Sequence, residues 1–125
     1  MENENESTRV VFVDRTCAPE RLVCEAEVVF GAGPLAGMKL VGFSLWRSPE
    51  GEVYITFPAR TFGAGTERRF FDYLRSVEGV SADGKRVKAW ILDAYKRERE
   101  PEQYAREQEE NAASFRSGVG GGIDR

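Results

Sequence analysis

Six basic residues and one threonine in the middle of the chain are the side chains best suited to binding chemistry. They are Arg60, Thr61, Arg68, Arg69, Lys85, Arg86 and Lys88. Guanidinium and ammonium groups bind phosphate oxygens, and a threonine hydroxyl adds a neutral hydrogen bond. Lys85 and Arg86 are expected near the start of a helix, where free backbone amides also favour phosphate. Such a cluster is a candidate nucleic-acid-binding site, although the residues by themselves favour the alternative interpretation. The alternative is a solvated charged face with local ion pairs, such as Asp83 with Lys85 or Lys88.

Aromatic side chains surround these bases in the sequence. They are Trp46, Tyr54, Phe57, Phe70, Phe71, Tyr73 and Trp90. Exposed aromatic rings on a sheet can stack with unpaired bases, although most of these seven are expected in the core or in a dimer interface. Trp90 is expected to be buried, and Trp46 and Tyr54 are the best candidates for exposure.

Catalytic chemistry finds little support in the sequence. The chain has no histidine, which removes the commonest general base and zinc ligand. The carboxylates considered for acid–base work are Glu25, Glu27, Asp72 and Asp93. Glu25 and Glu27 share a strand face but have no obvious basic partner, so a solvated outer face is expected. We therefore predict a protein that is not an enzyme and holds no cofactor or metal.

The two cysteines and a glycine-rich stretch are also interpreted structurally. Cys17 and Cys24 lack the spacing of a C-x-x-C motif, and we expect free thiols in a reducing compartment. The glycines at 31–37 lack a phosphate-binding fingerprint and precede a strand, so they predict a flexible loop.

Length and charge indicate one small domain with polar ends. The chain has 125 residues and a net charge of −3. Residues 8–98 carry fourteen bases and twelve acids, whereas residues 1–7 carry three acids and residues 99–125 carry six acids and four bases. We predict a disordered acidic N-terminus (1–7), a folded domain (8–98) and a polar, acidic, partly helical or disordered tail (99–125). No apolar run spans a bilayer and no secretory signal pattern opens the chain, so a cytoplasmic protein is expected.

The elements that would position these residues are mainly strands. Residues 9–14 and 21–30 predict a hairpin, with both faces of the first strand covered. Residues 38–60 predict a second hairpin around the turn Ser48-Pro49-Glu50-Gly51. In its first strand, Val41, Phe43 and Leu45 are expected on one face. Pro58 is expected to end the second strand or to place it at an edge.

The second half of the chain predicts a loop, a further strand and a helix. Residues 59–67 are expected to form a loop. Residues 68–77 are predicted as a strand, with a helix start as the alternative. A helix is expected from Ser81, capped by Ser81 or Asp83 and ended by Pro101. Its apolar stripe is Val87, Trp90, Ile91, Ala94 and Tyr95. The predicted fold class is α+β: a small antiparallel β-sheet of four to five strands with a C-terminal amphipathic helix packed on one face.

Three stretches in this order resemble the SpoVG family, the bacterial stage V sporulation protein G or septation-regulator proteins. They are KLVGFSLWRS at 39–48, YITFPAR at 54–60 and KRVKAWILDAY at 85–95. The resemblance covers about residues 8–98. The chain departs from the family pattern in its long 31–37 loop, in the absence of a proline at 73–80 and in its tail.

The resemblance implies a small dimeric regulator that binds DNA or RNA and has no enzymatic activity. It places a basic residue at Arg60 and implies a homodimer through β-strand contacts, with no membrane and no small-molecule substrate as partner. The alternative function is a protein–protein adaptor that uses the sheet edge and the tail without binding nucleic acid. A further hypothesis is that the acidic residues 99–117 cover the basic face and tune its affinity.

Overall fold

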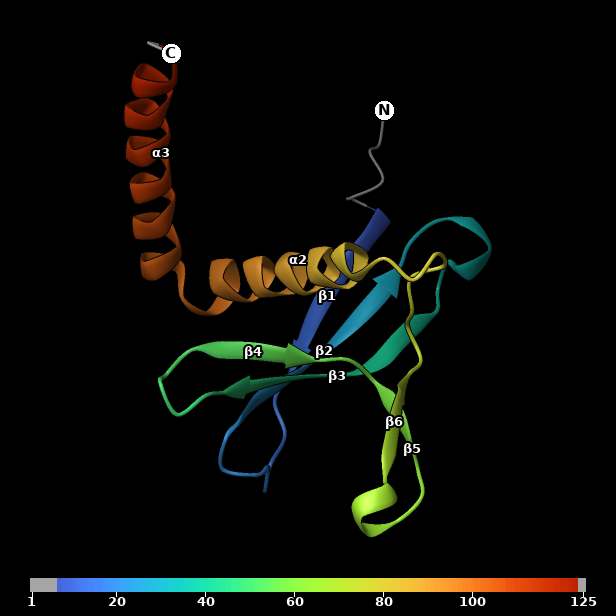
Figure 1. Cartoon of the computed structure of the whole chain (residues 1–125). Helices are drawn as coiled ribbons and strands as arrows, with labels where there is room; N and C mark the ends of the chain where they lie inside the picture. The colour runs from blue at the N-terminus through green and yellow to red at the C-terminus, as the bar shows by residue number, and fades with distance from the viewer. Residues whose placement is uncertain (1–6, 124–125) are drawn as a thin grey trace. The chain divides into compact units, whose positions relative to one another are not determined.

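The computed structural model describes the backbone of residues 7–123 and the side chains of residues 7–113. It shows an α+β fold with a four-stranded antiparallel sheet, a separate two-stranded sheet and two C-terminal helices (Figure 1). The predicted fold class is confirmed. Residues up to Leu92 form one compact unit and residues from Asp93 onward form a second, and each is described by itself. The acidic residues 1–6 lie outside the described part of the chain.

The four-stranded sheet has the order β1-β2-β3-β4. Its strands are β1 (Thr8–Val13), β2 (Leu22–Phe30), β3 (Lys39–Arg47) and β4 (Val53–Thr56). Both predicted hairpins are confirmed. In the second turn, Gly51 has a φ of 94° and its N–H donates to the Ser48 carbonyl at 2.9 Å, so glycine meets a real conformational demand there.

The core lies on one face of this sheet. Phe43 and Leu45 of β3 are fully buried, next to Ala26 and Cys24 of β2 in the antiparallel register. Ile91, from the helix α2 (Ser81–Arg99), is also fully buried. Figure 1 shows the first turns of α2 over one face of the sheet only. The predicted packing of an amphipathic helix on one face is therefore confirmed.

The opposite face of the sheet is partly exposed, including at its edge. β1 is an edge strand, and Val11 is 36% exposed. The expectation that both faces of this strand are covered was wrong, because only one face of the sheet carries a helix. Val13 and Val11 pair with Glu25 and Glu27 of β2 on this open face.

A bulge in β3 changes the expected alternation of its side chains. Two steps along β2 (Ala26 to Val28) match three steps along β3 (Phe43 to Leu40), and Gly42 there has a φ of 110°. The bulge turns Val41 outward, where it is 50% exposed, so grouping it with Phe43 and Leu45 was wrong. A Cβ on Gly42 would lie 2.7 Å from the Cβ of the buried Pro58, so glycine lets the chain after β4 pack against β3.

The two-stranded sheet was only partly predicted. β5 (Ala59–Phe62) and β6 (Arg69–Asp72) pair as a third hairpin, the β5–β6 hairpin, so the interpretation of 59–67 as a loop was wrong for its first half. β4 ends at Thr56, one residue before Phe57 and Pro58, as expected for a strand stopped by proline. β6 ends at Asp72 rather than near residue 77, because β5 offers only four residues for pairing after Pro58.

The helices follow the predicted boundaries more closely. α2 ends at Arg99, and Pro101 opens α3 (Pro101–Ile123), so the tail is helical over most of its length. Proline is tolerated at the first helical position because its missing N–H has no intrahelical partner. Trp90 is half-buried rather than buried, whereas Ile91 and Tyr95 of the same stripe are buried. In the second unit, Lys96 Nζ lies 3.2 Å from Glu107 Oε1.

None of the helices within residues 7–123 combines the length and the apolar character that a membrane span requires.

Candidate nucleic-acid interface

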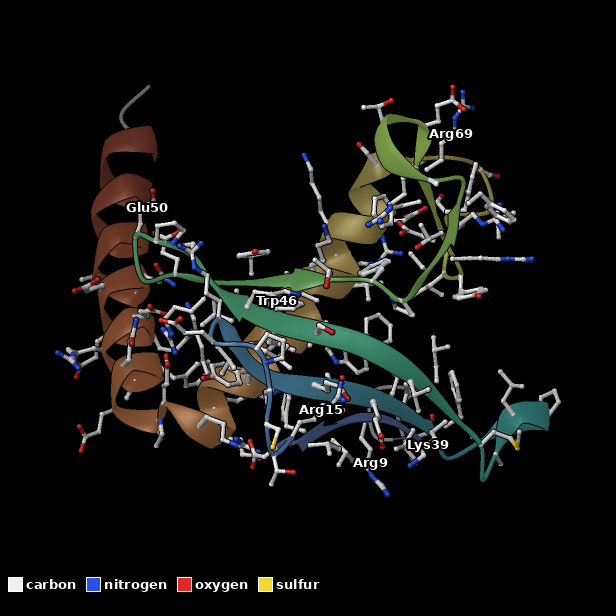
Figure 2. The ribbon with its side chains drawn as sticks, turned by 90° about the horizontal axis from the view of Figure 1, so that it is seen from below. Arg9, Arg15, Lys39, Trp46, Glu50 and Arg69 are labelled. Carbon is white, nitrogen blue, oxygen red and sulfur yellow. The ribbon has the colours of Figure 1, made fainter. Side chains whose placement is uncertain are left out.

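An open groove with a volume of about 870 Å³ lies where the two sheets and α2 meet in the first unit. One side is the end of the open sheet face, with Trp46 and Tyr54. Another side is one face of the β5–β6 hairpin, with Thr61 and Phe70. The first turns of α2 add further lining residues. Figure 2 shows Trp46 on the sheet face opposite α2, and Arg69 far from it on the β5–β6 hairpin.

Three of the seven predicted binding residues line this groove together. Thr61 comes from β5, and Lys85 and Lys88 come from successive turns of α2. Both lysines are exposed, and Lys88 Nζ lies 5.6 Å from the centre of the Phe57 ring. Two ammonium groups and a hydroxyl that line the same groove suit a chain of phosphates. Asp72 also lines the groove, so the charged side chains there are two lysines and one aspartate.

Arg86 has a local structural role instead. Its Nη1 lies 2.8 Å from Asp83 Oδ1. The Ser76 hydroxyl donates to the other carboxylate oxygen at 2.6 Å and accepts from the Val80 N–H at 3.0 Å. The hydrogen bond from Ser76, and then that from Arg86, lowers the pKa of the Asp83 carboxyl. Ser76, Asp83 and Arg86 therefore link the segment before α2 to the first turns of the helix. The capping of α2 by Ser81 or Asp83 stays a prediction.

The remaining arginines lie on or near the β5–β6 hairpin and do not line the groove. Antiparallel pairing matches Arg60 with Phe71 and Phe62 with Arg69. Arg60 Cζ lies 4.4 Å above the Phe62 ring, and this ring meets the Phe71 ring edge-to-face with centroids 5.4 Å apart. These four residues form the opposite face of the hairpin from Thr61 and Phe70. Arg68 lies just before β6, beside Arg69.

The aromatic side chains of the groove are held at defined positions. Trp46 and Tyr54 are cross-strand partners, and Trp46 Nε1 donates to Thr56 Oγ1 at 2.9 Å. Tyr54 is 48% exposed, as expected, and Trp46 is half-buried. Phe70 is 64% exposed and pairs with Thr61 across the β5–β6 hairpin. The sequence did not associate Phe70 with Thr61, because residues 59–62 were interpreted as a loop rather than as a strand.

Three of the four candidate carboxylates have basic partners that the sequence did not show. Glu25 Oε2 lies 2.9 Å from Arg15, and Glu27 Oε1 lies 2.9 Å from Lys39. Asp93 lies 3.1 Å from Arg97 in the second unit. The pairs of Glu25 and Glu27 belong to the solvated outer face expected for these two residues, but the expectation that they lack a basic partner was wrong.

The thiols and possible metal ligands add no second site. Cys17 is an exposed free thiol and Cys24 is a buried one in the core. Within the described residues, no group of three or more Cys, Asp or Glu side chains is arranged to hold a metal ion.

Comparisons with protein-family models, with curated proteins and with solved structures find no match. What this surface binds must therefore be inferred from its own residues.

Proposed function

We propose that this protein is a small, non-enzymatic regulator that binds nucleic acid, DNA or RNA, through the groove between β4, the β5–β6 hairpin and α2. One observation carries the proposal. The groove places Lys85, Lys88 and Thr61 beside the exposed rings of Tyr54 and Phe70. Cations that bind phosphates and rings that stack with bases are the two components of many nucleic-acid-binding grooves.

The resemblance of three sequence stretches to the SpoVG family also supports this proposal. All three stretches contribute to the groove: 39–48 supplies Trp46, 54–60 supplies Tyr54, and 85–95 supplies Lys85 and Lys88. A cytoplasmic regulator would also be compatible with the free thiols of Cys17 and Cys24.

The test is fluorescence anisotropy with labelled single-stranded DNA, duplex DNA and RNA at two salt concentrations. With two lysines on a single strand, affinity should fall about five- to tenfold between about 50 and 200 mM salt. Engagement of all six predicted bases would instead give a loss of roughly a thousandfold on duplex DNA. Absence of binding at micromolar protein and low salt would reject nucleic-acid binding as the function.

We also propose that the regulator is a homodimer joined through β-strand edges. β1 is the longer edge of the four-stranded sheet, and its Val11 is exposed. Pairing two such edges satisfies their backbone hydrogen bonds. Light scattering after gel filtration should show a dimer that Val11→Lys converts to a monomer, whereas Val41→Lys, at an exposed position in the interior strand β3, should not. A wild-type monomer would contradict the dimer.

A protein–protein adaptor is the second candidate function. It is favoured by the face of the β5–β6 hairpin that lies opposite Thr61 and Phe70. Phe62 and Phe71 are 43% and 44% exposed there, and the guanidinium of Arg60 lies over the Phe62 ring. Aromatic residues and arginine are enriched in protein interfaces. Retention on a heparin column that weakens with salt would favour the nucleic-acid function, because an adaptor need not show it.

A further inference from the structure

The groove contains more ring surface than phosphate-binding charge, and this balance distinguishes between kinds of nucleic acid. Trp46, Tyr54 and Phe70 line it, whereas Lys85 and Lys88 are its only lysines or arginines among the described residues. Asp72 offsets one of those charges. A site of this composition gains little from the phosphate backbone alone.

We propose that the groove is a binding site for single-stranded nucleic acid, in which unpaired bases stack on Tyr54 and Phe70 while Lys85 and Lys88 hold the adjoining phosphates. This inference rests on the proposed function and specifies its ligand. In a duplex, each base is already stacked between its neighbours, so exposed rings in a groove have no base face to meet. In a single strand, every base offers such a face.

The two rings that line the groove are presented from separate strands. Tyr54 projects from β4 and Phe70 from β6. The hydrogen bond from Trp46 Nε1 to Thr56 Oγ1 fixes the indole that pairs with Tyr54 across the sheet. A volume of about 870 Å³ lies near the upper end of the usual range for ligand sites, which leaves room for more than one nucleotide. Two separated rings along an open groove therefore suit a strand that passes between them.

Charge and hydrogen bonding determine what the groove reads. Stacking accepts any base, and the two lysines contact only phosphate, so little sequence preference is expected. The hydroxyl of Thr61 lies on the same hairpin face as Phe70 and can donate to a phosphate or sugar oxygen. Binding should therefore depend on strandedness more than on sequence.

The experiment measures anisotropy of a labelled oligo(dT) of about 15 nucleotides, near the upper end of known single-strand site sizes, and of a mixed-sequence duplex of equal length. Oligo(dT) should bind at least tenfold more tightly than the duplex. Tyr54→Ala and Phe70→Ala should each weaken oligo(dT) binding about tenfold or more, as expected for loss of one stacked base. Tyr54→Phe, which keeps the ring, should bind like the wild type.

Phe71→Ala is the matched control. Phe71 lies on the same strand as Phe70 and is also exposed, but it belongs to the opposite face of the hairpin. This variant should keep the wild-type affinity for oligo(dT). Circular dichroism and thermal melting of each variant should show an intact fold, so that losses of affinity report the ring and not unfolding.

Tryptophan fluorescence gives a second readout. The chain has two tryptophans, and Trp46 lines the groove whereas Trp90 does not. Oligo(dT) should quench the wild-type emission, and Trp46→Phe should abolish most of that quenching. Quenching that persists in Trp46→Phe would place the strand elsewhere and reject the site.

The outcomes separate the inference from the proposed function. Duplex binding as tight as oligo(dT) binding, or Tyr54→Ala and Phe70→Ala without effect, would overturn the single-strand inference and leave nucleic-acid binding standing. Loss of affinity in Phe71→Ala equal to that in Phe70→Ala would also overturn it. No binding at low salt to oligo(dT), to the duplex or to the labelled RNA would overturn both.

Discussion

The two sheets of the first unit contain the same kinds of residue and use them in opposite ways. In the four-stranded sheet, Phe43 and Leu45 are fully buried. In the β5–β6 hairpin, Phe62, Phe70 and Phe71 are 43%, 64% and 44% exposed. The first sheet has four strands and a helix over one face, whereas the hairpin has two strands and projects from it (Figure 1).

The difference separates stability from binding. A two-stranded hairpin is only marginally stable by itself, and little of this one is buried. Its rings therefore add little to the folding free energy and are available to a ligand. The four-stranded sheet supplies the buried apolar area that stabilises the fold. Substitutions in the two regions should consequently change different measured quantities.

The largest effect is expected in the core. Phe43→Ala should lower the free energy of unfolding by about 3–5 kcal/mol, because it removes a fully buried ring and leaves a cavity. Urea denaturation measures this loss. Phe70→Ala, the exposed counterpart, should change stability by no more than about 0.5 kcal/mol. Similar losses in the two variants would break the distinction between the sheets.

The second prediction concerns the junction of the two sheets. Gly42→Ala should destabilise the protein by about 1–3 kcal/mol, because a non-glycine residue is strained at a φ of 110° and its Cβ would press on Pro58. Gly51→Ala is the matched control, since Gly51 also has a positive φ but open space around its Cβ. The extra loss in Gly42→Ala isolates the contact with Pro58.

That contact should also control the hairpin. Amide hydrogen exchange should accelerate in β5 and β6 of Gly42→Ala more than in Gly51→Ala, because Pro58 leads directly into β5. Equal destabilisation of the two variants, with unchanged exchange in β5, would show that the junction does not depend on this close approach.

The sequence predicted the first sheet well and the second poorly, for a physical reason. Alternating apolar residues in β2 and β3 reflect one buried face, and burial is what makes periodicity visible. β5 buries no side chain fully, so residues 59–62 left no such pattern and were interpreted as a loop. The bulge at Gly42 was also not predicted, because a single glycine does not indicate where the register of a strand pair changes.

The same limitation applied to the candidate site. Thr61, Lys85 and Lys88 could be proposed from their chemistry, but their meeting in one groove depends on the turn at Pro58 and on the pairing of β5 with β6. Phe70 could be assigned to the groove only once its partner Thr61 was known to lie in a strand. Arg86 looked like its neighbours Lys85 and Lys88 until Asp83 was seen to engage it.

A smaller effect is expected from the lysines of the groove. Lys85→Gln with Lys88→Gln should weaken oligo(dT) binding about tenfold and reduce the salt slope by about 1.4, since each phosphate contact on a single strand contributes about 0.7. The unfolding free energy should be nearly unchanged, because both side chains are exposed.

Arg68→Gln with Arg69→Gln removes the same charge from the hairpin outside the groove and is the control. It should leave the salt slope close to that of the wild type. A larger loss in this control than in the lysine variant would move the binding surface to the opposite face of the hairpin.

The smallest effect concerns Asp83, the carboxylate that pairs with Arg86 next to the groove. Hydrogen bonds from Ser76 and Arg86 lower the pKa of this carboxyl below its ordinary value near 4. A lowered pKa in the folded state adds stability above the unfolded-state pKa, and this contribution is lost as the pH falls through the folded-state value.

Carboxyl NMR titration should place the pKa of Asp83 below that of an unfolded peptide. Ser76→Ala and Arg86→Gln should each raise it, because each variant removes a hydrogen bond that lowers this pKa. Since Arg86 is already engaged, Arg86→Gln should leave oligo(dT) affinity unchanged while it raises this pKa. An Arg86→Gln variant that loses affinity with no change in the Asp83 titration would instead assign Arg86 to the ligand, together with Lys85 and Lys88.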